Sequence, residues 1–218
     1  MNKNYKIAPS ILSADFSILK DEINSVNAAE YLHIDVMDGI FVPNISLGIP
    51  VIKSIRKTSD LIFDVHLMID RPGRFVKEFA SVGADIITIH AEASENLKDD
   101  LTLIKSLGKK AGVAIKPNTR LDVVYDVLEN VDMILIMSVE PGFGGQKLIP
   151  STFEKSLALS KIIADRNIDI EMDGGINLEN VDQVAKAGVN VIVAGSAIFN
   201  ASDRNKMIDA FKQKVLGQ

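Results

Sequence analysis

Eight short apolar segments alternate with helical periodicity along the whole chain, and this alternation restricts the possible folds more than any other feature. The segments cover residues 5–11, 31–35, 62–68, 85–90, 111–116, 133–138, 168–173 and 189–194. Near-continuous apolar runs of this kind are typical of parallel strands that are covered on both faces. Eight strand–helix units without a break in composition favour a (β/α)8 TIM barrel over an open doubly wound sheet, which usually has fewer strands. We therefore expect residues 1–218 to form a single barrel domain.

Helical signals fill the gaps between the strands. Ser94 is the expected N-cap of one helix, which Gly108 is expected to end, and Thr119 is the expected N-cap of the next helix. The apolar positions that recur at helical spacing are Leu97, Leu101 and Ile104; Leu121, Val124 and Leu128; and, in the last helix, Met207, Ile208, Phe211 and Val215.

The composition excludes several classes of protein. Hydrophobic residues make up 47% and charged residues 24% of the 218 residues, which is enough to bury a substantial core. The net charge of −5 argues against an extended basic surface for nucleic acid. The absence of cysteine excludes disulfides and thiolate chemistry, so any transition metal must be held by His, Asp or Glu.

The N-terminal residues run almost directly into the first strand. We find no apolar segment of the signal-peptide kind there, and no run in the chain that is long enough to cross a membrane. We therefore expect a cytoplasmic protein with no membrane partner and no nucleic-acid partner. We also expect a homo-oligomer, although the outer helices have ordinary amphipathic faces.

Polar side chains gather at the carboxyl ends of the predicted strands, where the active site of a (β/α)8 barrel lies. They are Ser10, His33, Asp35, His66, His90, Lys116, Asp173 and Ser196. The amino ends of the strands carry no comparable set. Because His33 and Asp35 are two residues apart on a strand, their side chains point to the same face.

Four of these groups are predicted to converge at one rim and hold a divalent metal ion. They are His33, Asp35, His66 and Asp173. Two imidazoles and two carboxylates suit Zn²⁺, which we expect first, and also Fe²⁺, Mn²⁺ or Co²⁺. His90, with Glu92 nearby, is expected to support these groups or to be structural, and not to be a ligand.

Glycine-containing loops follow the last three strands. Their residues are Gly142, Phe143, Gly144 and Gly145; Gly174 and Gly175; and Gly195 and Ser196. Glycine lets the backbone approach an anion closely, and loops at these barrel positions often bind phosphate. Each loop alone is more simply a tight turn, but three at adjacent positions favour a phosphate site. None of them matches the dinucleotide or P-loop fingerprints.

The two aspartates, Asp35 and Asp173, belong to the second and seventh strands. A substrate between them would present one face to each carboxylate, so that one could remove a proton and the other could return one to the opposite face of the same carbon. This is epimerisation next to a carbonyl, through an enediolate that a metal ion would stabilise as a Lewis acid. The same ion makes a carboxylate a poorer base, and exclusion of water would help to offset this effect.

Two further features keep alternative interpretations open. Met37, Met68 and Met137 lie at or just past strand ends, where they either pack in the core or line the site as polarizable apolar groups. Residues 41–47 and 143–149 are candidate loops for closure over a substrate, because they are longer and contain glycine or proline.

Six sequence blocks occur in a fixed order and span nearly the whole chain. They are APSILSAD at 8–15, HIDVMDGIFVPN at 33–44, DVHLM at 64–68, VEPGFGGQ at 139–146, DGGI at 173–176 and AGSAIF at 194–199. Together these blocks resemble the ribulose-phosphate 3-epimerase family. The departures are small: Leu148 stands where an aromatic residue is usual, and Met172 where valine is common.

The resemblance implies a barrel of the ribulose-phosphate-binding type and a phosphorylated pentulose as substrate. The implied reaction interconverts D-ribulose 5-phosphate and D-xylulose 5-phosphate in the pentose phosphate pathway. Asp35 would accept the proton and Asp173 would donate it in the direction from ribulose phosphate. Ser10 and His66 would contact the substrate, and His33, Asp35, His66 and Asp173 would bind the metal. The residues implied to hold the phosphate are Gly142, Phe143, Gly144, Gly145, Gly174, Gly175, Gly195 and Ser196.

Three alternatives stay open. An epimerase for a hexulose phosphate such as allulose 6-phosphate would use the same metal and the same acid–base pair. A lyase resembling orotidylate decarboxylase or hexulose-phosphate synthase would need Asp-x-Lys-x-x-Asp on the third strand, where this chain has His66 for the lysine and Ile69 for the last aspartate. A non-catalytic sugar-phosphate sensor would need the phosphate loops but neither the opposed carboxylates nor the metal.

Overall fold

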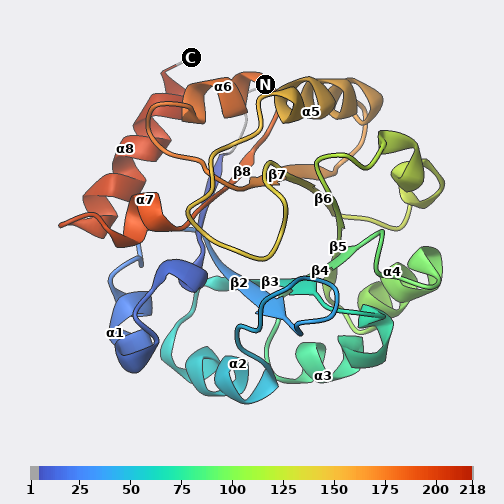
Figure 1. The fold of residues 1–218 in the computed structure, drawn as a ribbon, viewed down its shortest axis with the longest axis horizontal. Coiled ribbons are helices and arrows are strands. Elements are labelled where there is room, and N and C mark those ends of the chain that lie inside the picture. Colours follow the sequence, from blue (N-terminus) through green and yellow to red (C-terminus); the bar gives the residue numbers. More distant parts are fainter. Residues whose placement is uncertain (1–4, 218) are drawn as a thin grey trace.

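The computed structural model describes residues 5–217, and its centre is a sheet of eight parallel strands (Figure 1). The strands are β1 (Lys6–Pro9), β2 (Tyr31–Met37), β3 (Ile62–Met68), β4 (Ile86–His90), β5 (Lys110–Ile115), β6 (Met133–Met137), β7 (Asp169–Asp173) and β8 (Val191–Ala194). Each strand overlaps its predicted segment. The prediction of a (β/α)8 barrel is therefore confirmed.

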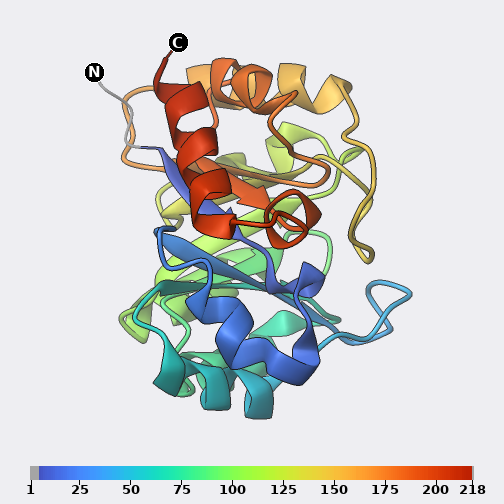
Figure 2. The same cartoon turned by 90° about the vertical axis from the view of Figure 1, so that its left-hand side faces the viewer.

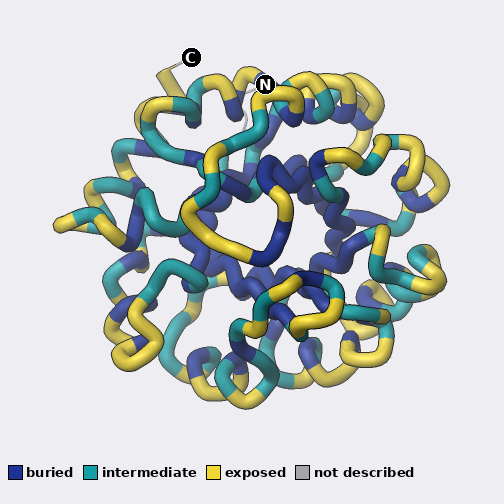
Figure 3. Tube along the Cα trace, viewed as in Figure 1, coloured by how far each residue is buried: buried dark blue, intermediate teal, exposed yellow. Residues whose placement is uncertain are grey.

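The strands are arranged in the circular order β1-β8-β7-β6-β5-β4-β3-β2. The circle closes between β1 and β2 through a parallel bridge that joins Ser10 to His33. All of the carboxyl ends consequently lie at one rim of the barrel. The loop after β6 lies over this mouth and is largely exposed, whereas the strands around it are buried (Figures 1 and 3).

Helices surround the barrel (Figures 1 and 2). The α-helices are α1 (Leu19–Asn24), α2 (Ile49–Ile55), α3 (Val76–Ser81), α4 (Leu97–Ser106), α5 (Ser151–Ile162), α6 (Val181–Lys186), α7 (Ser196–Phe199) and α8 (Arg204–Leu216). The 3-10 helices are η1 (Ile11–Ser13), η2 (Phe16–Ile18), η3 (Arg56–Thr58), η4 (Pro72–Phe75) and η5 (Leu121–Val127). Among these described residues, no helix is long and apolar enough to span a membrane.

Two predicted helix caps are wrong. The cap of α4 is Asn96, which accepts from the Asp99 amide, while the Ser94 hydroxyl donates to the Asp100 carboxylate instead. Thr119 does not cap the next helical segment, because its hydroxyl donates to the Glu92 carboxylate and η5 follows without a side-chain cap. In both places a carboxylate competes for the hydroxyl: Asp100 lies six residues after Ser94, and Glu92 is distant in sequence from Thr119.

The predicted end of α4 and the apolar face of α8 are found as expected. Gly108 follows α4 with a left-handed φ of 72°, the conformation that favours glycine after a helix. In α8, Ile208, Phe211 and Val215 are buried, and Met207 packs against the same core.

Side chains alternate between the two sides of each strand, and this alternation positions the functional groups. On β2, Leu32, Ile34 and Val36 belong to the large core between the barrel and its helices. Tyr31 belongs to a smaller cluster with Ala8, Ile86, Met133, Val191 and Val193. Since side chains two residues apart share a face, the polar residues 33 and 35 lie on the inner side with Tyr31.

Candidate active site

The inner rows of three strands carry the polar groups of the site. The parallel register of β2 and β3 sets His33 beside Asp64 and Asp35 beside His66. On β7, Met172 packs in the outer core, so its neighbours at 171 and 173 point into the barrel. Strand periodicity thus brings imidazoles and carboxylates from separate parts of the chain to one place.

The four predicted metal ligands lie together. Ligand atoms of His33, Asp35, His66 and Asp173 are all within 4.8 Å of one another. Asp35 Oδ1 is at the centre, 3.3 Å from His33 Nε2 and 3.2 Å from His66 Nδ1. His33 Nε2 is fully buried and has no hydrogen-bond partner. A buried nitrogen without a partner, beside a carboxylate and a second imidazole, is what a divalent cation would satisfy, so this donor set fits one.

The electrostatics of the cluster also favour a positive charge there. Burial alone would lower the pKa of the His33 imidazole, but the carboxylates of Asp35 and Asp64 raise that pKa well above its ordinary value. Burial likewise opposes ionisation of Asp35, yet the charge of the His33 imidazole, followed by its hydrogen bond, holds the pKa of this carboxyl far below its usual range. The pocket is therefore built to keep Asp35 ionised.

Asp173 behaves differently from Asp35. Burial, and then the charge of the Asp35 carboxylate, raise the pKa of Asp173 to about 6. Asp35 is further fixed by Ser10, whose hydroxyl donates to Oδ2 at 2.5 Å. Two neighbouring carboxyls whose pKa values are pushed apart are suited to opposite roles in proton transfer.

A second layer of carboxyl groups lies below the cluster. Asp64 Oδ2 is 2.6 Å from His33 Nδ1, and Glu171 Oε1 is 3.5 Å from the same nitrogen. Burial, followed by the Asp64 carboxylate, raises the pKa of Glu171 well above its ordinary value. Neither residue was predicted from the sequence. The signal was available, because each lies two positions before a predicted ligand and therefore on the same face of its strand.

His90 lies behind His66 and outside the ligand cluster. Its Nε2 is 2.9 Å from His66 Nε2, and its Nδ1 is 3.1 Å from Glu92 Oε2. The ammonium of Lys116 lies 4.2 Å from the ring centroid of Phe41, which in turn contacts the His90 ring. These two polar strand ends therefore flank the site without joining it.

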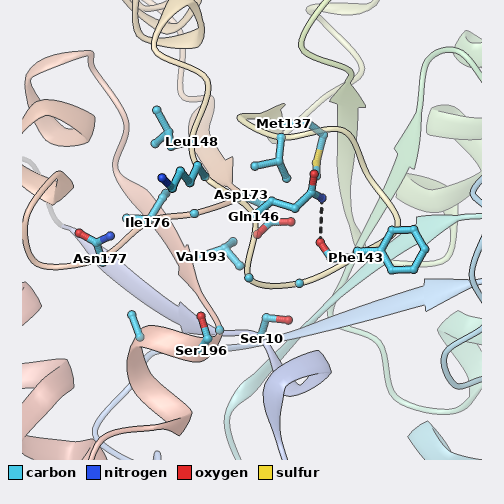
Figure 4. Close-up of a pocket in the computed structure, with 18 of the residues that line it drawn as sticks. Ser10, Met137, Phe143, Gln146, Leu148, Asp173, Ile176, Asn177, Val193 and Ser196 are labelled. Carbon is cyan, nitrogen blue, oxygen red and sulfur yellow. Dashed lines mark hydrogen bonds between the residues drawn. The ribbon is translucent and has the colours of Figure 1, made fainter.

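A cavity of about 730 Å³ opens above the cluster at the barrel mouth (Figure 4). Its lining includes Ser10, Asp35, Met37, Met68, Met137, Gly142, Phe143, Gly144, Gly145, Asp173, Gly174, Gly175, Gly195 and Ser196. The three methionines thus face the cavity. His33 and His66 are fully buried and do not line it, so the substrate contact of His66 stays a prediction. Ile176, Asn177, Glu179, Asn180 and Gln183 also line the cavity and were not predicted from the sequence.

The glycine loops after β6 and β7 pack tightly against each other. A Cβ at Gly174 would lie 2.6 Å from Val139, and one at Gly175 would lie 2.5 Å from the backbone at Gln146 and Leu148. Both glycines have left-handed φ angles, of 122° and 66°. The turn after β7 therefore requires glycine for its conformation and for its contact with the neighbouring loop.

Comparisons with known proteins identify the relatives of this chain. The model of the ribulose-phosphate 3 epimerase family matches residues 6–199. The chain belongs to this family. It is 46% identical to a ribulose-phosphate 3-epimerase from Bacillus subtilis over 212 residues, covering 95% of this chain and 98% of that protein. It is 51% identical to one from Synechocystis sp. over 207 residues, covering 92% and 90%.

Membership of the ribulose-phosphate 3-epimerase family makes this chain an isomerase, and the resemblance found in the sequence blocks is confirmed. The fold is shared more widely. A 3-hexulose-6-phosphate synthase from Salmonella typhimurium superposes with a TM-score of 0.70 at 20% identity, covering 97% of this chain and 99% of that one. At that identity the likeness concerns the barrel alone.

In this member of the family, the two loops that were candidates for closure are joined. Asn44 Nδ2 in the loop after β2 donates to the carbonyl of Gly142 in the loop after β6, at 2.8 Å. The second loop is braced internally by Gln146, whose Nε2 donates to the carbonyl of Glu140 at 2.7 Å. The same nitrogen donates to the carbonyl of Phe143 at 2.9 Å (Figure 4). Both loops project from the same side of the barrel (Figure 2).

Proposed function

We propose that this chain catalyses the 3-epimerisation of D-ribulose 5-phosphate to D-xylulose 5-phosphate, a reaction of the pentose phosphate pathway. The observation that carries the proposal is the pairing of Asp35 and Asp173 at the floor of the cavity. The first is held ionised, whereas the pKa of the second is raised to about 6. Asp173 therefore takes up a proton more readily than Asp35, and the two carboxyls are unequal partners in proton transfer.

In the proposed mechanism, carbon 3 of the sugar lies between the two carboxyls. Asp35 accepts the proton from carbon 3, and negative charge develops on the carbonyl oxygen of carbon 2. Asp173 then donates a proton to the opposite face of the same carbon, which inverts its configuration. In the reverse direction the two roles exchange. The hydroxyl of Ser10 holds the Asp35 carboxylate in place for this transfer.

His33, Asp35, His66 and Asp173 would hold the divalent metal ion, with Zn²⁺ expected first and Fe²⁺, Mn²⁺ or Co²⁺ also suited to these donors. When bound, the ion supplies Lewis-acid stabilisation of the developing oxyanion, worth several kcal/mol. The apolar side chains of Met37, Met68 and Met137 exclude water from the same region and so preserve the basicity of the carboxylates.

The loops after β6, β7 and β8 would bind the phosphate of the substrate. They form one side of the cavity wall, through residues 142–145, 174–175 and 195–196. The glycines leave backbone N–H groups accessible to an anion. This arrangement leaves the carbonyl end of the sugar toward the carboxylates and the phosphate end toward α7.

The deciding experiment is a coupled assay that compares ribulose 5-phosphate with allulose 6-phosphate, with metal analysis of the same sample. We expect turnover of the pentulose phosphate to exceed that of the hexulose phosphate clearly. In D₂O, the product should carry deuterium at carbon 3 and nowhere else. A preference for allulose 6-phosphate would refute the substrate assignment, and deuterium at carbon 1 would instead indicate an aldose–ketose isomerase.

A further inference from the structure

A chain of four polar side chains runs from the cavity floor to the outside of the barrel mouth. Asp35 Oδ1 is 3.2 Å from His66 Nδ1, and His66 Nε2 is 2.9 Å from His90 Nε2. His90 Nδ1 is in turn 3.1 Å from Glu92 Oε2. Only Asp35 and His66 belong to the proposed metal site, so the other two residues have no role in the mechanism described above.

We infer that His90 and Glu92 are positioning residues that fix the proton of His66 on Nε2, so that the lone pair of Nδ1 faces the metal site. This inference rests on the metal site of the proposed function. It follows from counting hydrogen-bond donors and acceptors along these four side chains, beginning at Glu92.

Glu92 fixes the first proton. An ionised carboxylate only accepts hydrogen bonds, so the nitrogen of His90 that faces it must carry the hydrogen. The other oxygen of Glu92 is occupied, because it accepts from the Lys116 amide at 2.7 Å and from the Thr119 hydroxyl. The carboxylate is therefore held in place by the loop after β5 and cannot turn away from His90.

The hydrogen position on His90 then determines which nitrogen of His66 carries a hydrogen. A neutral His90 with its hydrogen on Nδ1 has a lone pair on Nε2, so His66 Nε2 must donate across the 2.9 Å contact. A neutral His66 consequently has its lone pair on Nδ1, facing Asp35 Oδ1 at 3.2 Å. Two acceptors at that distance repel each other unless a cation lies near both.

The opposite placement of the hydrogens is unfavourable at Glu92, the outer end of the four side chains. If His66 donated from Nδ1 to Asp35, His90 would donate from Nε2 and its bare Nδ1 would face the Glu92 carboxylate. The packing also opposes reorientation of the rings, because His90 is fully buried. The centroid of its ring is 4.7 Å from that of Phe41 and 5.0 Å from that of His66. The hydrogen bonds of Glu92 and His90 thus favour the tautomer of His66 that can bind a metal.

The test measures the dissociation constant for Zn²⁺ in the full-length protein after dialysis, by competition with a chromogenic chelator. In Glu92→Gln, the side-chain amide can present a donor to His90 and reverse the order of hydrogens. In His90→Leu, the acceptor for His66 is lost. Since such partners of ligating histidines are typically worth 10- to 100-fold in metal affinity, we expect the dissociation constant to rise by about that factor in both variants.

Two further variants serve as matched comparisons. His90→Gln keeps a side-chain oxygen that can accept from His66, and should recover much of the affinity that His90→Leu loses. Glu95→Gln removes the same charge from an exposed position in the same loop, and should bind Zn²⁺ within about twofold of the parent. Because the chain has three histidines, the ring ¹⁵N shifts of His66 can also be followed directly. We expect the hydrogen on Nε2 in the parent protein above pH 8, without metal.

The outcomes separate this inference from the proposed function. If the parent protein bound Zn²⁺ while Glu92→Gln and His90→Leu bound it equally well, the inference would be overturned and the metal site would stand. A hydrogen found on Nδ1 of His66 in the parent would overturn it too. If the parent bound no Zn²⁺ at all, the proposed metal site and the inference would fail together.

Discussion

Asp35 and Asp173 present carboxylate oxygens within 4.8 Å of each other, although their strands, β2 and β7, are separated around the barrel by β1 and β8. The curvature of the closed sheet brings these strand ends toward a common point. The two groups are chemically unequal there, because the His33 imidazole holds the pKa of Asp35 low, whereas burial and then the Asp35 charge raise the pKa of Asp173.

This inequality predicts the effect of Asp173→Asn. An amide can neither donate nor accept the proton, so we expect kcat to fall about 10²- to 10⁴-fold in both directions, with the fold retained. The assay is a coupled measurement at saturating metal, with circular dichroism to verify folding. Asp165→Asn removes the same charge at an exposed position and should turn over like the parent. Near-normal turnover of Asp173→Asn would remove this residue from the mechanism.

The ligand cluster predicts a dependence on metal. Protein treated with a chelator should lose activity and regain it when Zn²⁺, Mn²⁺, Fe²⁺ or Co²⁺ is added. Because the ion binds the folded state, metal at about 100 times its dissociation constant should also stabilise the fold by about 2.7 kcal/mol, which calorimetry would detect as a higher Tm. Full activity of strictly metal-free protein would contradict the proposal.

The close packing at Gly175 predicts a specific defect in Gly175→Ala. A methyl group there would lie 2.5 Å from the backbone of the neighbouring loop, which cannot shift without distorting the cavity wall. We expect KM to rise by about tenfold or more, which corresponds to about 1.4 kcal/mol of lost binding.

Gly108→Ala is the matched comparison for this substitution. Gly108 has a similar left-handed φ of 72°, but nothing lies within 4 Å of its Cβ position. Its replacement should lower the free energy of unfolding by about 1 kcal/mol and leave KM unchanged. Equal effects of the two substitutions on KM would show that the contact at Gly175 does not shape the binding site.

The hydrogen bond between the two mouth loops predicts the behaviour of Asn44→Ala. Loss of this 2.8 Å contact with Gly142 removes about 1 kcal/mol that holds the loops together. We expect faster amide hydrogen exchange in residues 140–149 and a KM raised by up to about fivefold. Asn24→Ala, at an exposed position on α1, should change neither quantity. Unaltered exchange in Asn44→Ala would show that the loops are held by other contacts.

Local sequence patterns predicted the strands well, because a buried parallel strand is an apolar run whatever its partners are. They also predicted that the four candidate ligands would lie together, since polar residues at the carboxyl ends of barrel strands share one rim. The helix caps at Ser94 and Thr119 were wrong for a different reason. Both hydroxyls bind carboxylates, Asp100 on α4 and Glu92 in the loop after β4, which the fold brings within reach.

The sequence by itself determined the strand–helix alternation, the side of each strand that carries polar groups, and the family. Only the tertiary structure decided which groups are neighbours beneath the rim: that Asp64 supports His33, that His90 lies against His66, and that the Asp35 charge acts on Asp173. Periodicity along one strand fixes the direction of a side chain, whereas its partner depends on register between strands and on closure of the barrel.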